Sequence, residues 1–404
     1  MIWIVYTLFA LDLAGMSLSF GIIQKHVLIL GGSLYHVGLI TSITAILAFF
    51  WKPIAGRLSD NKGPQKIMIW CLLASAVGNL AIGSSYTLYL LVIARIIQIF
   101  GTPNQGLLRS ILTTLKTENI SKMLNKIGIV TSASLIVGSL VGGFLSEFEN
   151  GILYRYSLMA LFNLLSIVLV KQLPVDNIIQ EEKSDTSSSF KKATTEINAA
   201  LRSMAMFFVS DKYGHIFVMK AVIATLFQFR QTALLYQFTI GLEFTGRQIG
   251  YIISVMFLWN IFINLVLIKV TKKLYPTDKG GKRILHACAI TALAMVGHAL
   301  YPASVTPSIF FLLVGGVANA LIDVALMELF LERVEEKEKG VAMNSFDSVG
   351  SLSELVAPLA CNACLGAMGA PVTFLAGGIL AMGAMGICFR NLREGGMTRM
   401  DEEE

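Results

Sequence analysis

The chain has 404 residues, of which 55% are hydrophobic and 14% are charged, and its mean hydropathy is +0.68. A soluble domain carries about 25% charged residues, so this composition excludes a single soluble core and favours a polytopic membrane protein. The net charge of +6 comes from bases spread over short loops, which indicates membrane topology rather than nucleic-acid binding.

Apolar runs of about 20 residues, the length that a membrane-spanning helix needs, recur along the whole chain. They lack the period-two alternation of barrel strands, so we predict an all-α membrane protein with twelve transmembrane helices. The first run starts at residue 2 without a basic leader, so we expect a retained span and not a cleaved signal peptide. The expected spans are residues 2–24, 35–56, 66–85, 87–110, 122–146, 152–170, 213–240, 248–269, 283–301, 308–331, 341–365 and 371–390.

Ionisable side chains inside these spans are the strongest pointer to function. A charge at a helix centre costs roughly 2.5–3.5 kcal/mol on insertion scales, so nine of them facing lipid would cost roughly 25 kcal/mol. We therefore expect most to face a protein interior, a partner charge or a water-filled pathway. The nine residues are Asp12, Lys52, Arg95, Lys220, Arg230, Asp323, Glu328, Asp347 and Glu354.

The Lys and Arg residues divide unevenly between the two sides of the predicted membrane. One side, which includes the loops after even-numbered spans and the C-terminus, holds 25 of the 32. The other side holds only Lys25, Arg155 and Arg247. Because basic loops stay in the cytoplasm, we predict that both termini are cytoplasmic, in either the plasma membrane or an endomembrane.

The loop after span two, residues 56–66, reads GRLSDNKGPQK. It resembles the signature loop of the major facilitator superfamily, where glycines permit a tight turn and an aspartate meets a helix end or a base. A similar basic turn, DKGGKR at 278–283, follows span eight. The alternative is an ordinary loop that sets topology. The resemblance implies a breakable gate that includes Gly56, Asp60, Gly63, Asp278 and Gly281.

Spans four and five carry two further motifs of this kind. Residues 93–98 read IARIIQ and resemble the arginine motif of the superfamily, which points to Arg95. Residues 138–143 read GSLVGG and resemble its antiporter motif, with Ser139 in place of a proline. The resemblance implies close helix packing at Gly138, Gly142 and Gly143.

An internal repeat divides the chain into two halves. The tetrapeptide VGSL occurs at 137–140 in span five and again at 349–352 in span eleven. Repeats six spans apart support a duplicated six-helix unit. The predicted domains are an N-terminal bundle (1–170), a polar cytoplasmic linker (171–212), a C-terminal bundle (213–390) and an acidic cytoplasmic tail (391–404).

Span one reads LDLAGMSL at 11–18 and resembles the first span of tetracycline/proton antiporters. With span five and the aspartate of span ten, the chain is similar to the tetracycline-transporter-like and organic-cation-transporter-like branch. The resemblance implies two pseudo-symmetric six-helix bundles whose spans 1, 4, 7 and 10 line a cavity. Five candidate residues fall on these spans: Asp12, Arg95, Lys220, Arg230 and Asp323.

Two carboxylates are the candidates for proton or substrate-cation coupling. Burial favours the protonated form of a carboxyl group, so Asp12 and Asp323 are suited to taking up and releasing protons. Each has a structural alternative, a fixed ion pair of Asp12 with Arg95 and of Asp323 with Lys220.

The remaining charges have structural interpretations. Glu354 in span eleven is a further candidate for proton coupling or substrate binding, and its structural interpretation is a pair with Arg230, since pairing neutralises two costly groups. Glu328 and Lys52 lie close enough to the cytoplasmic face to extend toward it. Asp347 shares the helical face of Glu354.

These observations predict a secondary active transporter that moves a small organic solute, cationic or amphiphilic, by proton antiport with alternating access, as multidrug transporters do. No GxxxxGK(S/T) loop for nucleotides is present. We expect no enzyme activity, catalytic residue, cofactor or metal site. The expected partners are the solute, protons and the bilayer, and the expected state is a monomer. Two alternatives stay open: a uniporter or lipid-type transporter of the same fold, and a non-transporting membrane scaffold or receptor.

Overall fold

The computed structural model describes residues 2–104, 107–108, 120–173, 213–275, 281–333 and 339–394. All regular elements in these ranges are helices, which confirms the predicted all-α class. Most of the predicted linker, the tail beyond residue 394 and Asp278 lie outside the described residues, as do the side chains of Asp60 and Asp347.

The helices before the linker follow most of the predicted spans closely, but the helix of span four, expected at 87–110, ends at Ile99. They are α1 (Ile2–Leu18), α2 (Ile22–Ile29), α3 (Leu34–Lys62), α4 (Pro64–Gly83), α5 (Leu88–Ile99), α7 (Ile120–Leu145) and α8 (Gly151–Val170).

The helices after the linker include one π-helical turn, η1, and one very long helix, α15. They are α11 (Gly214–Tyr236), η1 (Gln237–Gly241), α12 (Gly246–Leu274), α13 (Gly281–Leu300), α14 (Val305–Arg333) and α15 (Lys339–Glu394).

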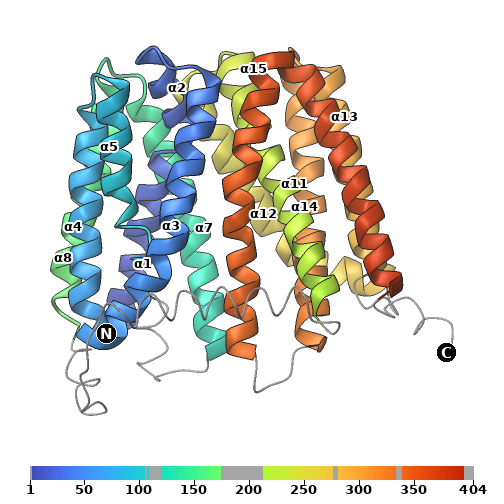
Figure 1. Cartoon of the computed structure of the whole chain (residues 1–404), viewed down its shortest axis with the longest axis horizontal. Helices are drawn as coiled ribbons and strands as arrows, with labels where there is room; N and C mark the ends of the chain where they lie inside the picture. Colours follow the sequence, from blue (N-terminus) through green and yellow to red (C-terminus); the bar gives the residue numbers. More distant parts are fainter. Residues whose placement is uncertain are drawn as a thin grey trace. The chain divides into compact units, whose positions relative to one another are not determined.

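Seven described helices are long and apolar enough to cross a membrane, and α1 with α2 forms an eighth candidate with a 42° bend. The apolar part of α15 is 42 residues long, enough for two spans, and its two arms meet at Gly369 (φ 76°), where the ribbon turns back in Figure 1. With α15 counted twice and α1 with α2 counted once, the described helices match the twelve expected spans.

Two further expected boundaries are wrong. Span one is not a continuous helix, because Gly21 adopts a left-handed conformation (φ 74°) that ends α1 and starts α2. The expected loop at 56–62 is helical, since α3 continues to Lys62 and only Gly63 (φ 90°) makes the turn. Pro64 then begins α4, where its fixed φ suits the first helical position.

The described contacts group the chain into two compact units. In the first unit, α1 packs along α7, and α4 packs against both α8 and α5 (Figure 1). In the second unit, α15 packs along α11 and α13. The first unit comprises 1–32, 46–197 and 244–257, and the second comprises 33–45, 198–243 and 258–404. Relative to the predicted division at the linker, residues 33–45 fall in the second unit and residues 244–257 fall in the first. The predicted domain limits stay a prediction.

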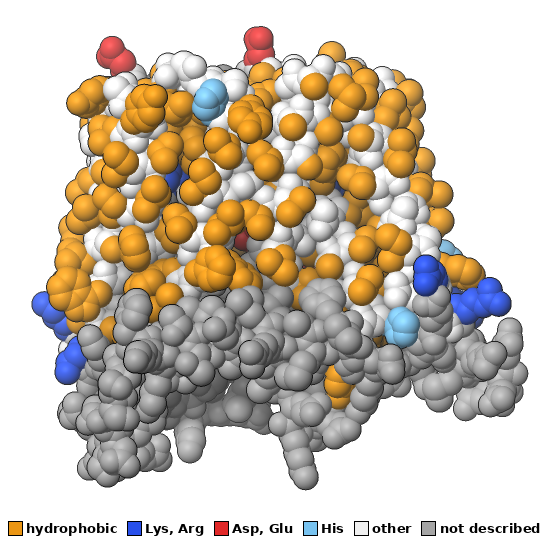
Figure 2. Space-filling view, viewed as in Figure 1, with side chains coloured by type: hydrophobic (Ala, Val, Ile, Leu, Met, Phe, Trp, Pro, Cys, Tyr) orange, Lys and Arg blue, Asp and Glu red, His pale blue; other side chains and the backbone are white. Residues whose placement is uncertain are grey.

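Each unit has its own apolar core, and large apolar side chains also cover its outside. The first core includes Leu8, Phe9 and Met68, and the second includes Leu226 and Ala381. On the face drawn in Figure 2, hydrophobic side chains spread over the described helices, while most charged ones lie toward the ends. Apolar surface of this extent is suited to lipid and not to water.

Glycine allows a close helix contact in the first unit, between α4 and α5. A Cβ at Gly78 would lie 2.6 Å from the backbone nitrogen of Gln98. We therefore expect Gly78→Ala to force the two helices apart and to destabilise the protein by about 1–3 kcal/mol, as overpacked cores do. The check is the apparent Tm of the purified protein in detergent.

The matched control is Gly386→Ala, because a Cβ at Gly386 meets no atom within 4 Å. We expect its Tm to equal or slightly exceed that of the wild type, because alanine is favoured over glycine inside a helix by roughly 0.5–1 kcal/mol. Equal melting of Gly78→Ala and Gly386→Ala would contradict the packing argument.

Candidate functional site

A small cavity in the second unit brings together two of the predicted site residues, Arg230 and Asp323. Its volume is about 20 Å³, close to the space that one water molecule needs. The cavity is lined by Ile223, Leu226, Phe227, Arg230, Thr291, Asn319, Ile322 and Asp323.

Arg230 supplies the positive charge of this cavity and is deeply buried. Only 2% of its surface is exposed, and its Nε and Nη1 groups have no hydrogen-bond partner among the described residues. The guanidinium fits because α14 has a glycine opposite it: a Cβ at Gly315 would overlap Nη1. A buried guanidinium without a partner carries a large desolvation cost, so this site is suited to receiving an acceptor from outside.

Asp323 supplies a charge of the opposite sign to the same cavity. Its side chain is solvent-accessible, in contrast to that of Arg230. The structural alternative for Asp323, an ion pair with Lys220, does not form in the structure, although the lysine acts electrostatically on Asp323. Lys220 Nζ instead lies 4.8 Å from the centroid of the Phe346 ring, a cation–π distance.

The expected pair between Glu354 and Arg230 also does not form. Glu354 is exposed on α15 and accepts a hydrogen bond from Gln228 Nε2 at 3.3 Å. Gln228 and Arg230 are two residues apart on α11, and helical residues at that spacing point in different directions. Arg230 therefore points toward α14, away from the glutamate.

In the first unit, Asp12 and Arg95 form no ion pair with each other, so the structural alternative for Asp12 is not seen in the described structure. Asp12 is half-buried and receives a hydrogen bond of 3.4 Å from Asn104 Nδ2. Arg95 Nη1 donates to Gln98 Oε1 at 2.5 Å, and Gln98 Nε2 donates to Asn79 Oδ1 at 2.5 Å. This hydrogen-bonded chain from α5 to α4 satisfies the arginine in part without a carboxylate.

The glycines of the predicted antiporter motif lie at two helix contacts of the first unit. A Cβ at Gly138 would overlap Ala14 and Ser17 of α1, and one at Gly142 would lie 3.1 Å from the Leu18 backbone. Gly143 instead meets the start of α12, where its Cβ would lie 3.0 Å from the carbonyl oxygen of Gly246.

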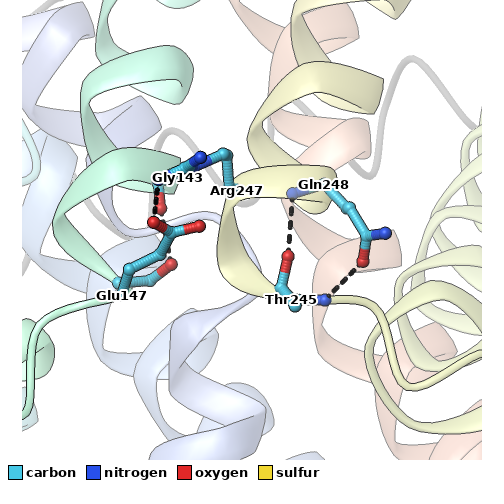
Figure 3. Close-up of polar contacts among 6 residues, drawn as sticks. Gly143, Glu147, Thr245, Arg247 and Gln248 are labelled. Carbon is cyan, nitrogen blue, oxygen red and sulfur yellow. Dashed lines mark hydrogen bonds and ion pairs between the residues drawn. The ribbon is translucent and has the colours of Figure 1, made fainter.

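The contact between α7 and α12 also carries polar interactions (Figure 3). Arg247 forms an ion pair with Glu147, close to Gly143. The first turn of α12 is closed by a capping box, in which Thr245 N donates to Gln248 Oε1 at 2.8 Å and Gln248 N donates to Thr245 Oγ1 at 3.3 Å. This box fixes the helix end that bears Arg247.

Of the predicted gate residues, the structure places three. Gly56 lies within α3, Gly63 makes the turn before α4, and Gly281 begins α13 against the side chain of Leu392. Asp278 and the side chain of Asp60 are outside the described residues, so no contact of the gate is described.

Two cations expected near the loops of the less basic side instead line a larger cavity of the first unit. This cavity has a volume of about 220 Å³, and Lys25 and Arg155 both line it. Arg155 is 4% exposed, and its Nε has no hydrogen-bond partner among the described residues. The signal that identified the other candidates, an ionisable residue inside an apolar run, applies equally to Arg155, the fifth residue of α8.

The charges predicted to be structural lie at helix surfaces. Lys52 is exposed on α3. Glu328 Oε2 lies 2.6 Å from Arg283 Nη2, in an ion pair between α14 and α13. In the described ranges, no group of three or more His, Cys, Asp or Glu side chains has the geometry of a metal site.

Comparison with known sequences shows the family. The model of the Major Facilitator Superfamily matches residues 2–358. Over 332 residues the chain is 23% identical to the tetracycline resistance protein of class H from Pasteurella multocida, covering 80% of this chain and 78% of that protein. It is 25% identical over 197 residues to multidrug resistance protein 1 of Bacillus subtilis, covering 44% of this chain and 50% of that protein.

Comparison with solved structures shows the same fold. The human organic anion transporter MFSD10 (TETRAN) matches with a TM-score of 0.66 at 17% identity, covering 96% of this chain and 98% of that one. The nucleoside transporter NupG matches with a TM-score of 0.73 at 13% identity, covering 97% and 98%. The predicted fold class is thus confirmed, and the relatives are membrane transporters and not enzymes. The chain is a multi-pass integral membrane protein that belongs to the major facilitator superfamily.

Proposed function

We propose that the protein is a proton antiporter for an amphiphilic organic solute that carries both an acidic and a basic group. The observation that carries this proposal is the pairing of a buried, unpartnered Arg230 with an accessible Asp323 on one cavity of the described structure. Alternating access between two bundles, with both termini in the cytoplasm and the protein acting as a monomer, completes the proposal.

Arg230 is suited to the acidic group of the solute. A guanidinium presents its N–H groups in a planar fork that matches a carboxylate or enolate. Because Nε and Nη1 have no partner in the described structure, such a group would form hydrogen bonds without first breaking any. The organic anion transporter among the structural neighbours is compatible with this chemistry.

Asp323 is suited to coupling. A protonated basic group of the solute and a free proton would compete for the same carboxylate, and such competition is what antiport requires. The aromatic ring of Phe227 lines the same cavity and offers a face to a cation. Tetracycline, which appears in the name of the relative from Pasteurella multocida, carries acidic and basic groups on an apolar body.

The cavity is too small to hold such a solute in the described conformation, since about 20 Å³ accommodates only one water molecule. The helices around it must therefore move before the solute binds. This requirement agrees with alternating access, in which a site near the bilayer midplane opens to one side at a time.

The substrate class is tested by binding to the purified full-length protein. Tetracycline, p-aminohippurate and uridine represent an amphiphile with both charges, an organic anion and a nucleoside. A ligand that binds the folded state raises the Tm by mass action, and we expect the largest rise for tetracycline. A rise with p-aminohippurate or uridine alone would reject the proposed substrate class.

Proton coupling is tested in proteoliposomes that contain a pH-sensitive dye. We expect tetracycline to dissipate an imposed pH gradient faster with protein than in protein-free liposomes. Facilitated tetracycline movement without any substrate-dependent pH change would favour the uniporter. Absence of both movement and binding for every probe would favour the scaffold or receptor.

Removal of the Arg230 guanidinium should impair transport without impairing folding. We expect Arg230→Gln to lower the kcat/KM of tetracycline transport at least about tenfold, because a charge-assisted hydrogen bond contributes about 1.5–3 kcal/mol. The Tm should stay equal or rise, since a costly buried charge is removed. Arg230→Lys should keep part of the activity, because it retains the charge but not the fork.

The matched control is Arg393→Gln, which removes an exposed arginine near the end of α15. It should transport at the wild-type rate. If Arg230→Gln transported normally, the proposed substrate contact would be wrong.

Neutralisation of Asp323 should uncouple the protein. We expect Asp323→Asn to abolish accumulation driven by a pH gradient but to keep solute exchange at equal pH, because Asn cannot carry the proton. Radiolabelled tetracycline exchange and gradient-driven uptake in the same liposomes measure the two activities. Asp12→Asn is the comparison: if it alone uncouples transport, the coupling carboxylate lies in the first unit and not at Asp323.

A further inference from the structure

The proposed function does not involve the larger cavity, whose lining residues all belong to the first unit. It lies beside the end of α1, the start of α2, and parts of α7, α8 and α12, with a volume of about 220 Å³. This volume is an order of magnitude above that of the cavity at Arg230, and it is large enough for an organic head group. Its charged lining residues are Lys25, Glu149 and Arg155.

The free hydrogen-bond donors of this cavity are cationic. Its serine hydroxyls donate within their own helices, Ser17 to Ala14 O at 3.0 Å, Ser139 to Ile136 O at 3.0 Å and Ser146 to Gly143 O at 2.6 Å. Arg155 Nε has no partner among the described residues. Lys25 Nζ donates to Phe244 O at 3.0 Å, which leaves two of its three N–H groups for a ligand.

The charges of the cavity also favour an anion. Lys25 and Arg155 are close enough that the arginine acts electrostatically on the lysine, so two like charges repel each other. The exposed Glu149 reduces the formal charge of the lining from +2 to +1 but forms no ion pair with either cation among the described contacts. Buried cations in proteins are normally compensated by an anion, and an external anionic group would provide that compensation.

Glycine again permits close packing beside the guanidinium. A Cβ at Gly246 would overlap Ser146 Oγ and would lie 2.9 Å from Arg155 Nη2. The rim of the cavity is apolar and exposed, since Ile29 is 71% exposed and Phe148 is 47% exposed. An anionic head attached to an apolar body would satisfy the cations and cover this rim.

We propose that the Lys25–Arg155 cavity binds the anionic head group of an amphiphile, with a phosphate or carboxylate between the two cations and the apolar body over Ile29 and Phe148. The same chemistry is offered by an anionic phospholipid of the bilayer and by a free amphiphilic acid. The site is separate from the Arg230 cavity and does not depend on the proposed transport function.

The test uses the purified full-length protein in a neutral detergent and measures the rise of Tm during titration with each probe. The probes are dihexanoyl phosphatidylglycerol, dihexanoyl phosphatidylcholine, benzoate and inorganic phosphate. We expect saturable binding of phosphatidylglycerol that weakens with salt. Arg155→Gln and Lys25→Gln should each raise its Kd about tenfold, the loss expected for one charge-assisted hydrogen bond.

Two further variants distinguish a change of Kd caused by the site from one caused by a folding defect. Glu149→Gln should lower the Kd several-fold, because it removes the negative charge of the lining without touching either cation. Lys171→Gln removes an exposed cation at the other end of α8 and should leave the Kd unchanged. If Arg155→Gln does not fold, the opposite shifts of Lys25→Gln and Glu149→Gln still test the site.

The probes separate the two sources of ligand. Binding of phosphatidylglycerol without benzoate identifies a lipid, and comparable binding of both identifies a general site for amphiphilic acids. Equal affinity for phosphatidylcholine, equal affinity for inorganic phosphate, or wild-type Kd values in all three cavity variants would each overturn the proposal.

Discussion

The cost of burying a charge among apolar helices is the constraint on which the other features of this protein depend. A membrane protein tolerates ionisable groups inside its spans only where they meet a partner or water. In the described structure, some of the arginines have an ion-pair or hydrogen-bond partner, and others keep donors without a partner. Arg283 pairs with Glu328, Arg95 is hydrogen-bonded through Gln98, and Arg155 and Arg230 are buried with donors unsatisfied.

Four described arginines, Arg95, Arg155, Arg230 and Arg247, have an Nε without a hydrogen-bond partner, and two of them share a local architecture. Each lies against a glycine of a neighbouring helix, Arg155 against Gly246 and Arg230 against Gly315, and each lines a cavity. A Cβ at Gly315 would occupy the space of the Arg230 guanidinium, and one at Gly246 would overlap Ser146 and lie 2.9 Å from Arg155 Nη2. Small residues in these helices therefore do more than permit close packing, because they also create the space in which a costly cation is kept available for a ligand.

Membership of the major facilitator superfamily gives these cavities a functional context. A transporter must bind its solute and also release it, so a site with permanently paired charges is of little use to it. An unpartnered arginine beside an accessible carboxylate keeps the opposite charges available within one cavity of the described structure. The interface of α7 with α12 is the opposite case. There Glu147 pairs with Arg247 beside closely packed glycines, and the two charges stabilise a contact between helices.

The helical class and the approximate span limits could be predicted from the amino-acid order, because the bilayer imposes the length and composition of each span. The superfamily was indicated by motifs that resemble its own, above all the loop at 56–66. Arg230 and Asp323 could also be selected as candidates, since any charge in an apolar run is conspicuous, and their role stays a proposal. Which charges meet became clear only from the folded arrangement. The expected pair of Glu354 with Arg230 and the alternative pair of Asp12 with Arg95 are absent, and Arg155 lies in a cavity and not in a loop. Pairing depends on how each helix is rotated about its axis and on which neighbour has a glycine opposite, and neither is encoded in the periodicity of a single span.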